Sequence, residues 1–181
     1  MTLASDRPPA GYPTDLERHH RLGDGRTLFV RPVVPDDAVL LARALEAADP
    51  ETVYQRFLRE PVRLDAMDLD RLTRLDYTTR LALAAFAPDG SGIGIVRYET
   101  VEPGIAEMAI VVDAAWRGQG VASMLLELLE SAAAERGIKR MTAYFLPSNR
   151  AVIALLQAFG YATEAPDRGV ATAAKDLAPS T

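Results

Sequence analysis

The sequence predicts a single mixed α/β domain, and three observations lead to this prediction. Hydrophobic residues make up 49% of the 181 residues and charged residues 25%, which is the composition of an ordinary soluble globular protein. Short apolar stretches typical of strands alternate with longer stretches in which apolar residues recur at helical spacing. The resulting order is strand, helices, three strands, helix, strand, helix and closing strand, with no internal repeat.

The N-terminal segment differs in composition from the rest of the chain. Residues 1–20 are mostly polar and contain three prolines and a glycine between positions 8 and 13. We therefore expect a flexible tail here, and one domain over residues 21–181. Residues 23–25 are Gly-Asp-Gly, which is typical of a turn, and residues 27–30 follow as the first strand.

Three helical pieces are expected after this strand. Asp36 or Asp37 can cap a helix that runs to about Ala48, because apolar residues recur there at helical spacing. The Asp-Pro pair at residues 49–50 ends that helix and opens a second short one. A third helical piece is expected over residues 64–75.

An antiparallel meander of three strands comes next. The strands are expected at residues 81–86, 93–101 and 105–112. The first two are separated by Pro-Asp-Gly-Ser-Gly, which is typical of a hairpin turn, and the last two by Glu-Pro-Gly.

The C-terminal part alternates between helices and strands. A long helix is expected from Gly120 to Arg136, with Gly137 as its left-handed cap. A strand follows at residues 139–145. The next helix covers residues 149–159, with Ser148 or Asn149 as its cap, and residues 161–177 hold one or two closing strands.

Composition and charge exclude several classes of function. Disulfides are excluded because the chain has no cysteine, and the adjacent His19 and His20 are its only histidines, so we expect no metal site. Twenty basic against 25 acidic residues give a net charge of −5, which argues against nucleic acid as the main partner. The longest apolar run, residues 81–87, is far shorter than the ~20 residues of a membrane helix. Without a secretory signal, the protein is expected to be cytoplasmic.

The most informative stretch is Trp-Arg-Gly-Gln-Gly-Val-Ala at residues 116–122, between a strand and the long helix. Glycines before a helix let the backbone approach a ligand closely, and the free N–H groups of a helix N-terminus favour anions. The pattern lacks the lysine of a P-loop and the glycine spacing of a dinucleotide fingerprint. Taken alone, Gly118 and Gly120 are better explained by a simple turn.

Two motifs taken together change this interpretation. The pattern Arg117-x-x-Gly120-x-Ala122 resembles the R/Q-x-x-G-x-G/A signature of the GNAT N-acetyltransferase superfamily, which wraps the pyrophosphate of acetyl-CoA. The stretch from Asn149 to Tyr161 is similar to that family's asparagine-led helix ending in Gly-aromatic. The resemblance implies the GNAT fold, with a central, mostly antiparallel sheet of about seven strands flanked by helices. It also implies acetyl-CoA as co-substrate.

The resemblance assigns residues to acetyl-CoA. The backbone of Ile110, Val111 and Val112 would present its N–H and C=O groups to the pantetheine arm and the acetyl oxygen. The remaining expected contacts come from the motif and from the two helix starts: Arg117, Gly118, Gln119, Gly120, Val121, Ala122, Ser123 and Asn149. Two of these residues also have a purely structural explanation. Ser123 could cap its own helix turn, and Asn149 could serve only as an N-cap.

Four further segments narrow the resemblance. DGRTLFVRPVVPDDA, TVYQRF, LTRLDY and LPSNRAVIALL are similar to the catalytic domain of bacterial protein lysine acetyltransferases. The expected acceptor is therefore a protein lysine, with a small-molecule amine as the alternative within the same chemistry. A non-catalytic acyl-CoA-binding module is the alternative from another class. The sequence leaves open whether the protein is a monomer or a homodimer.

Acyl transfer to an amine requires the neutral amine, whereas a lysine ammonium has a pKa of about 10.4. A base or proton wire that removes the proton is therefore useful. The chain has no Ser-His-Asp or Cys-His set, so we expect the acetyl group to pass directly to the amine, without a covalent enzyme intermediate. The resemblance implies Glu107 as the base, since it stands just before the apolar run of its strand. Glu99 and Glu102 are nearby rivals.

One position departs from the family pattern. Many members carry a tyrosine on the last helix as general acid toward the thiolate, and the matching residue here is Leu156. Tyr144 and Tyr161 flank it in sequence, but each is expected to be a packed sheet aromatic. The sequence therefore assigns no general acid.

Overall fold

The computed structural model describes residues 8–48, 52 and 65–178. Its centre is an eight-stranded sheet in the order β1-β2-β3-β4-β5-β6-β8-β7. All neighbouring strands are antiparallel except β5 and β6, which run parallel. The strands are β1 (Arg18–Arg21), β2 (Thr27–Pro32), β3 (Arg80–Phe86), β4 (Gly92–Glu102), β5 (Ile105–Val112), β6 (Arg140–Phe145), β7 (Ala162–Thr163) and β8 (Ala171–Asp176). The mixed α/β prediction with a mostly antiparallel sheet is thus confirmed.

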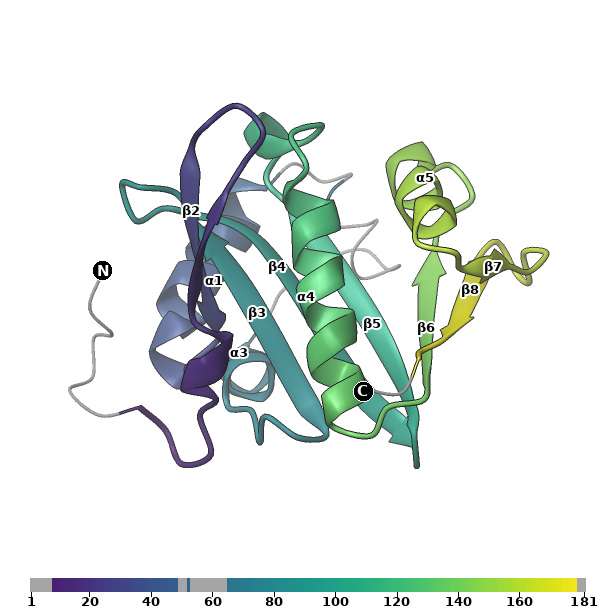
Figure 1. The fold of residues 1–181 in the computed structure, drawn as a ribbon, viewed down its shortest axis with the longest axis horizontal. Coiled ribbons are helices and arrows are strands. Elements are labelled where there is room, and N and C mark those ends of the chain that lie inside the picture. The colour runs from purple at the N-terminus through teal and green to yellow at the C-terminus, as the bar shows by residue number, and fades with distance from the viewer. Residues whose placement is uncertain (1–7, 49–51, 53–64, 179–181) are drawn as a thin grey trace.

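Helices cover both faces of the sheet (Figure 1). Helix α4 crosses one face over β3, β4 and β5, and α1 and α3 lie behind the sheet on the other face. The helices are α1 (Ala38–Ala47), α3 (Ala66–Thr73), α4 (Val121–Glu135) and α5 (Arg150–Ala158), and short 3-10 turns occur at Thr14–Leu16, Pro35–Asp37 and Ala114–Trp116. The second short helix expected after Asp49 lies outside the described residues, apart from Thr52.

Helix α4 packs closely on the sheet through one buried face. Its buried residues recur every three or four positions: Val121, Met124, Leu125, Leu126, Leu129, Ala132 and Ala133. On β4, a side chain at Gly94 would place its Cβ 3.2 Å from Leu125 Cδ1. The glycine therefore lets α4 lie close to the sheet, and it identifies the face to which the even-numbered residues of β4 point.

The described part of the N-terminal segment, from residue 8, contains regular structure that its composition did not suggest. A flexible tail was expected over residues 1–20, but β1 begins at Arg18 and pairs with β2 from Arg18–Val30 to Arg21–Thr27. Ahead of it, Tyr12 and Leu16 are buried in the core, and the Tyr12 ring meets Tyr77 edge to face. The described structure therefore starts well before residue 21, because apolar side chains spaced among the prolines anchor this segment to the sheet.

A buried ion pair fixes the start of α1. Asp37 precedes the helix as expected, but its carboxylate makes no cap bond to it. It accepts instead from both terminal nitrogens of Arg31, at 2.7 Å each, and from the backbone N–H of Val34 at 2.8 Å. Burial alone would lower the pKa of Arg31, and the bidentate contact with Asp37 raises it above its ordinary value. The pair connects β2 to α1 across the face opposite α4.

We expect Asp37→Asn to lower the free energy of unfolding by about 3 kcal/mol, since it leaves the buried guanidinium of Arg31 without its counter-charge. Asp24→Asn is the matched control, because Asp24 pairs with Arg26 at an exposed site, where solvent screens the charges and the loss should be much smaller. Urea denaturation of both variants measures the difference. Equal losses would contradict a special role for the buried pair.

Candidate active site

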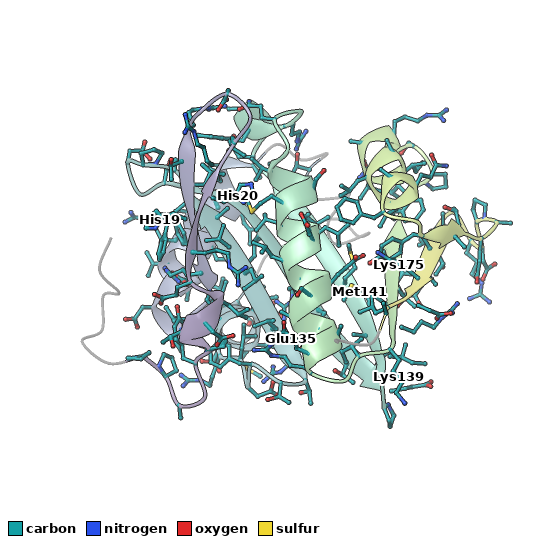
Figure 2. All side chains as sticks on the ribbon, in the orientation of Figure 1. His19, His20, Glu135, Lys139, Met141 and Lys175 are labelled. Carbon is teal, nitrogen blue, oxygen red and sulfur yellow. The ribbon has the colours of Figure 1, made fainter. Side chains whose placement is uncertain are left out.

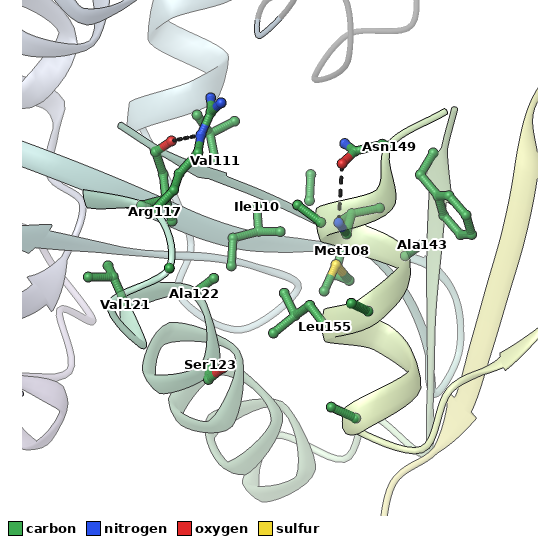
Figure 3. Close-up of a pocket in the computed structure, with 18 of the residues that line it drawn as sticks. Met108, Ile110, Val111, Arg117, Val121, Ala122, Ser123, Ala143, Asn149 and Leu155 are labelled. Atoms are coloured by element: carbon green, nitrogen blue, oxygen red, sulfur yellow. Dashed lines mark hydrogen bonds between the residues drawn. The ribbon is translucent and has the colours of Figure 1, made fainter. Parts of the chain in front are cut away.

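A cavity of about 450 Å³ opens where β5 and β6 separate (Figure 3). The two strands pair in register from Ile105–Arg140 to Met108–Ala143, and no pairing continues beyond that point although both strands do. Residues 109–112 of β5 form one wall of the cavity. The N-terminus of α4 and one face of α5 form the others, and Ile110 and Leu155 face the cavity from β5 and α5.

The backbone of β5 is oriented toward this gap. Asp113 N–H donates to Ile93 O at 2.9 Å, so the hydrogen-bonded pairs with β4 fall on the odd-numbered residues of β5. Ile110 and Val112 therefore direct their N–H and C=O groups away from β4, toward the side where β6 has separated. The expected backbone contacts of Ile110 and Val112 with a ligand are compatible with this geometry, whereas Val111 contributes its side-chain surface to the cavity.

The glycine loop before α4 has the backbone that the motif requires. Gly118 and Gly120 have φ values of 71° and 84°, in the left-handed region. A Cβ at either position would meet no atom within 4 Å, so conformation rather than space demands glycine there. Gly120 is the N-cap of α4 and supplies no side-chain cap, which leaves the first N–H groups of the helix to face the cavity. Val121, Ala122 and Ser123 line it at this point.

Arg117 and Gln119 have different positions in this loop. Arg117 lines the cavity, and its Nε donates to Val112 O at 3.2 Å, which ties the loop to the end of β5. The Gln119 side chain instead donates to Ala115 O at 2.8 Å and accepts from Arg26. Gln119 does not line the cavity, so its expected ligand contact is limited to its place in the loop.

Asn149 serves as the N-cap of α5 and also lines the cavity. Its Oδ1 accepts from the backbone N–H of Val152 at 3.1 Å (Figure 3). Of the two caps expected for this helix, Asn149 is therefore the one observed. Its amide nitrogen makes no recorded bond among the described residues and can donate to a ligand in the cavity.

Glu107 lies beside the cavity rather than in its lining. Its exposed side chain follows buried Ala106 on β5, at the last pairs before the strands separate. The register places it on the face opposite α4, in line with Ala109 and Val111, which do line the cavity. Of the rivals, Glu99 pairs with Arg71 at 2.8 Å. The histidines lie on β1, at the far end of the sheet (Figure 2).

The three positions considered for a general acid differ in exposure. Leu156 is fully buried, as a core leucine would be. Tyr161 is also buried, which confirms the expected packing, and burial together with neighbouring Glu130 raises its pKa. Tyr144 departs from expectation, because 48% of it is exposed and it lines the cavity. Parallel pairing puts Tyr144 on the face of Glu107. Its alternation with buried Ala143 and Phe145 was the sequence signal for this exposure.

Two absences hold for the part of the chain that the structure describes. No group of three or more His, Cys, Asp or Glu side chains is placed to hold a metal ion. Within the same residues, no helix is long and apolar enough to cross a membrane.

The chain belongs to the acetyltransferase (GNAT) family, whose model matches residues 42–161. It is an acetyl-CoA-dependent N-acetyltransferase, with acetyl-CoA as its co-substrate.

Known relatives agree with this classification. The crystal structure of the GNAT domain of S. lividans PAT is similar with a TM-score of 0.85 and 38% identity, over 92% of this chain and 99% of that one. An acetyltransferase of Pseudomonas aeruginosa is 30% identical over 77% of each chain. Acetyltransferase Pat of Mycolicibacterium smegmatis is 29% identical over 86% of this chain, which spans only 47% of that relative.

We expect Gly120→Ala to weaken acetyl-CoA binding roughly fivefold or more, as loss of ~1 kcal/mol of helix-terminus interaction would do. The matched control is Gly137→Ala at the other end of α4, where φ is 82° and a Cβ also meets nothing within 4 Å. Both variants should lose about 1–2 kcal/mol of stability through left-handed strain. Calorimetric titration distinguishes them, and equal affinities would contradict a ligand role for the α4 start.

Proposed function

We propose that this N-acetyltransferase acts on a protein lysine, with Glu107 as the base. The observation that carries the proposal is the position of Glu107, on the strand whose next residues line the cavity and on the face opposite α4. The similarity to the GNAT domain of S. lividans PAT, at 38% identity over nearly the whole chain, supports a protein as the acceptor.

The residues around the cavity suit the parts of acetyl-CoA. The uncapped α4 start and the Gly118–Gly120 turn would take the pyrophosphate, with Val121, Ala122 and Ser123 in the first helical turn. The N–H and C=O groups that Ile110 and Val112 direct away from β4 would bond the pantetheine amides, as an additional strand does. Arg117 would hold the loop in place through Val112, and Asn149 would contribute its amide nitrogen.

The reaction proceeds by direct transfer. Glu107 accepts a proton from the lysine ammonium, and the neutral nitrogen attacks the thioester carbonyl to form a C–N bond. A backbone N–H of β5 close to the point where the strand loses its pairing with β6 stabilises the oxyanion of the tetrahedral intermediate. The C–S bond then breaks, the nitrogen releases its second proton to solvent, and the acetyl group stays on the lysine as an amide. Coenzyme A leaves as a thiolate, whose pKa near ~8.5, by analogy with cysteine, makes departure possible without an assigned acid.

We expect Glu107→Gln to lower turnover by about 10²-fold or more while changing acetyl-CoA affinity little, because the amide keeps the shape but accepts no proton. Glu102→Gln is the matched control, since Glu102 is an exposed carboxylate at the end of β4. Coenzyme A release with pooled proteins and, separately, pooled small amines measures both variants.

Three outcomes of that assay differ in meaning. Release with proteins that Glu107→Gln abolishes supports the base and the acceptor class together. Release only with small amines would replace the lysine acceptor by a small molecule. Calorimetric binding of acetyl-CoA without release to any acceptor would instead favour a non-catalytic acyl-CoA-binding module.

A further inference from the structure

A second cavity, of about 300 Å³, lies under α1 and α3 on the sheet face opposite α4. It shares β5 residues with the first cavity, since Ala109, Val111 and Val112 line both. The two cavities therefore meet at the stretch of β5 where the sheet splits. Glu107 lies on the same sheet face as this second cavity. An acceptor amine that reaches Glu107 would approach from this side.

The walls of the second cavity are mostly apolar, but they include four charged side chains. Two are carboxylates with partners, since Asp37 pairs with Arg31 and Asp113 accepts from the N–H of Ala115 at 2.8 Å. The third is Arg117, which donates to Val112 O and to Thr52 Oγ1. The fourth is Arg97, and no hydrogen bond or ion pair is recorded for its guanidinium among the described residues.

Only 7% of the surface of Arg97 is exposed. Burial lowers its pKa below the ordinary value, and the charges of Arg71 and Arg80 lower it further. The carboxylate of Glu99 acts in the opposite direction, but it is already paired with Arg71 at 2.8 Å. A buried guanidinium with no ion pair among the described residues is costly, so an anion that enters the cavity would bind favourably.

The surrounding charges strengthen this preference. Among the described residues, the carboxylate that acts on the charge of Arg97 is Glu99, which also pairs with Arg71, and Arg71 has Asp68 nearby as well. The Arg80 guanidinium donates to the carbonyls of Arg71 and Arg74 at the end of α3, at 3.5 Å and 3.2 Å, and these contacts do not neutralise its charge. Arg71, Arg80 and Arg97 thus form a group of three positive charges on the side of the sheet from which the acceptor would approach.

The strand register places Arg97 near the proposed base. Arg97 is opposite Ala109, and Glu107 is the next residue along β5 on the same face. Such diagonal positions are roughly 7 Å apart, which is a span that one side chain or one residue of a peptide covers.

From this arrangement we propose that Arg97 binds a carboxylate of the acceptor, so that the preferred acceptor is an amine with an acidic group beside it. In a protein substrate this group is an aspartate or glutamate that flanks the acetylated lysine. The proposal deepens the proposed function and rests on it for the direction from which the acceptor approaches. Arg97 is a residue of substrate specificity and takes no part in proton transfer.

The test compares two peptides that differ only by Glu or Gln beside the acceptor lysine. We expect the wild-type protein to show a kcat/KM about 10-fold or more higher for the Glu peptide, in line with a charge-assisted bidentate contact. Arg97→Met should abolish this ratio, and Arg97→Lys should restore part of it, because lysine keeps the charge without the planar fork. Arg18→Met, on the far strand β1, is the control and should keep the wild-type ratio.

Two further measurements keep the proposal separate from the proposed function. Calorimetric titration of the acetylated Glu and Gln peptides into the coenzyme A complex reports carboxylate recognition without turnover, and acetyl-CoA affinity reports whether each variant is folded. Free lysine against lysinamide tests the other source of a carboxylate. A preference confined to free lysine would support carboxylate binding and overturn the protein acceptor.

The proposal is overturned if the wild-type protein neither acetylates nor binds the Glu peptide better than the Gln peptide, with free lysine and lysinamide equal as well. It is also overturned if Arg97→Met folds and retains the preference. Should Arg97→Met fail to fold, the wild-type peptide comparison and Arg97→Lys still decide the question.

Discussion

The structure depends on one constraint, which is that β5 keeps its pairing with β4 after it has lost its pairing with β6. Up to Met108 the strand is held on both sides, and from residue 109 to Val112 only on one. Unpaired backbone groups in a protein interior are costly, so such a gap persists only where something else satisfies them. Arg117 donates to the Val112 carbonyl, and the backbone N–H and C=O of Ile110 point toward the cavity, where a ligand can bond them. The fold thus builds a binding edge into the centre of its own sheet.

The same split connects two faces of the sheet that carry different parts of the site. The α4 side carries the glycine loop and the start of the helix, where an anion is favoured. The opposite side carries Glu107 and the cavity that contains Arg97, under α1 and α3. A thioester on one side and an amine on the other can meet only through the gap. Direct transfer, with no covalent enzyme intermediate, fits this arrangement.

Local rules in the sequence were enough to predict most of the elements and the α4 motif. Gly120, Gly137 and Asn149 end or begin their helices as turn and capping chemistry requires. What local rules missed depended on distant contacts. The packing of Tyr12 against Tyr77 orders a proline-rich segment. The exposure of Tyr144 follows from the separation of β6, and the Asp37 carboxylate turns from its helix to Arg31 because β2 brings that arginine beside it.

The sequence could not distinguish Arg31 from Arg97, although the two arginines have different surroundings in the structure. Both are buried arginines on strands, and the register places both on the face opposite α4. Arg31 meets a bidentate carboxylate and the ring of Phe86, and so its charge is balanced within the fold. Arg97 borders a cavity instead, and the carboxylate that acts on it, Glu99, is paired with Arg71. Because the fold pairs the guanidinium of Arg31 fully and the described residues give Arg97 no ion pair, we infer that the counter-charge of Arg97 arrives with the substrate.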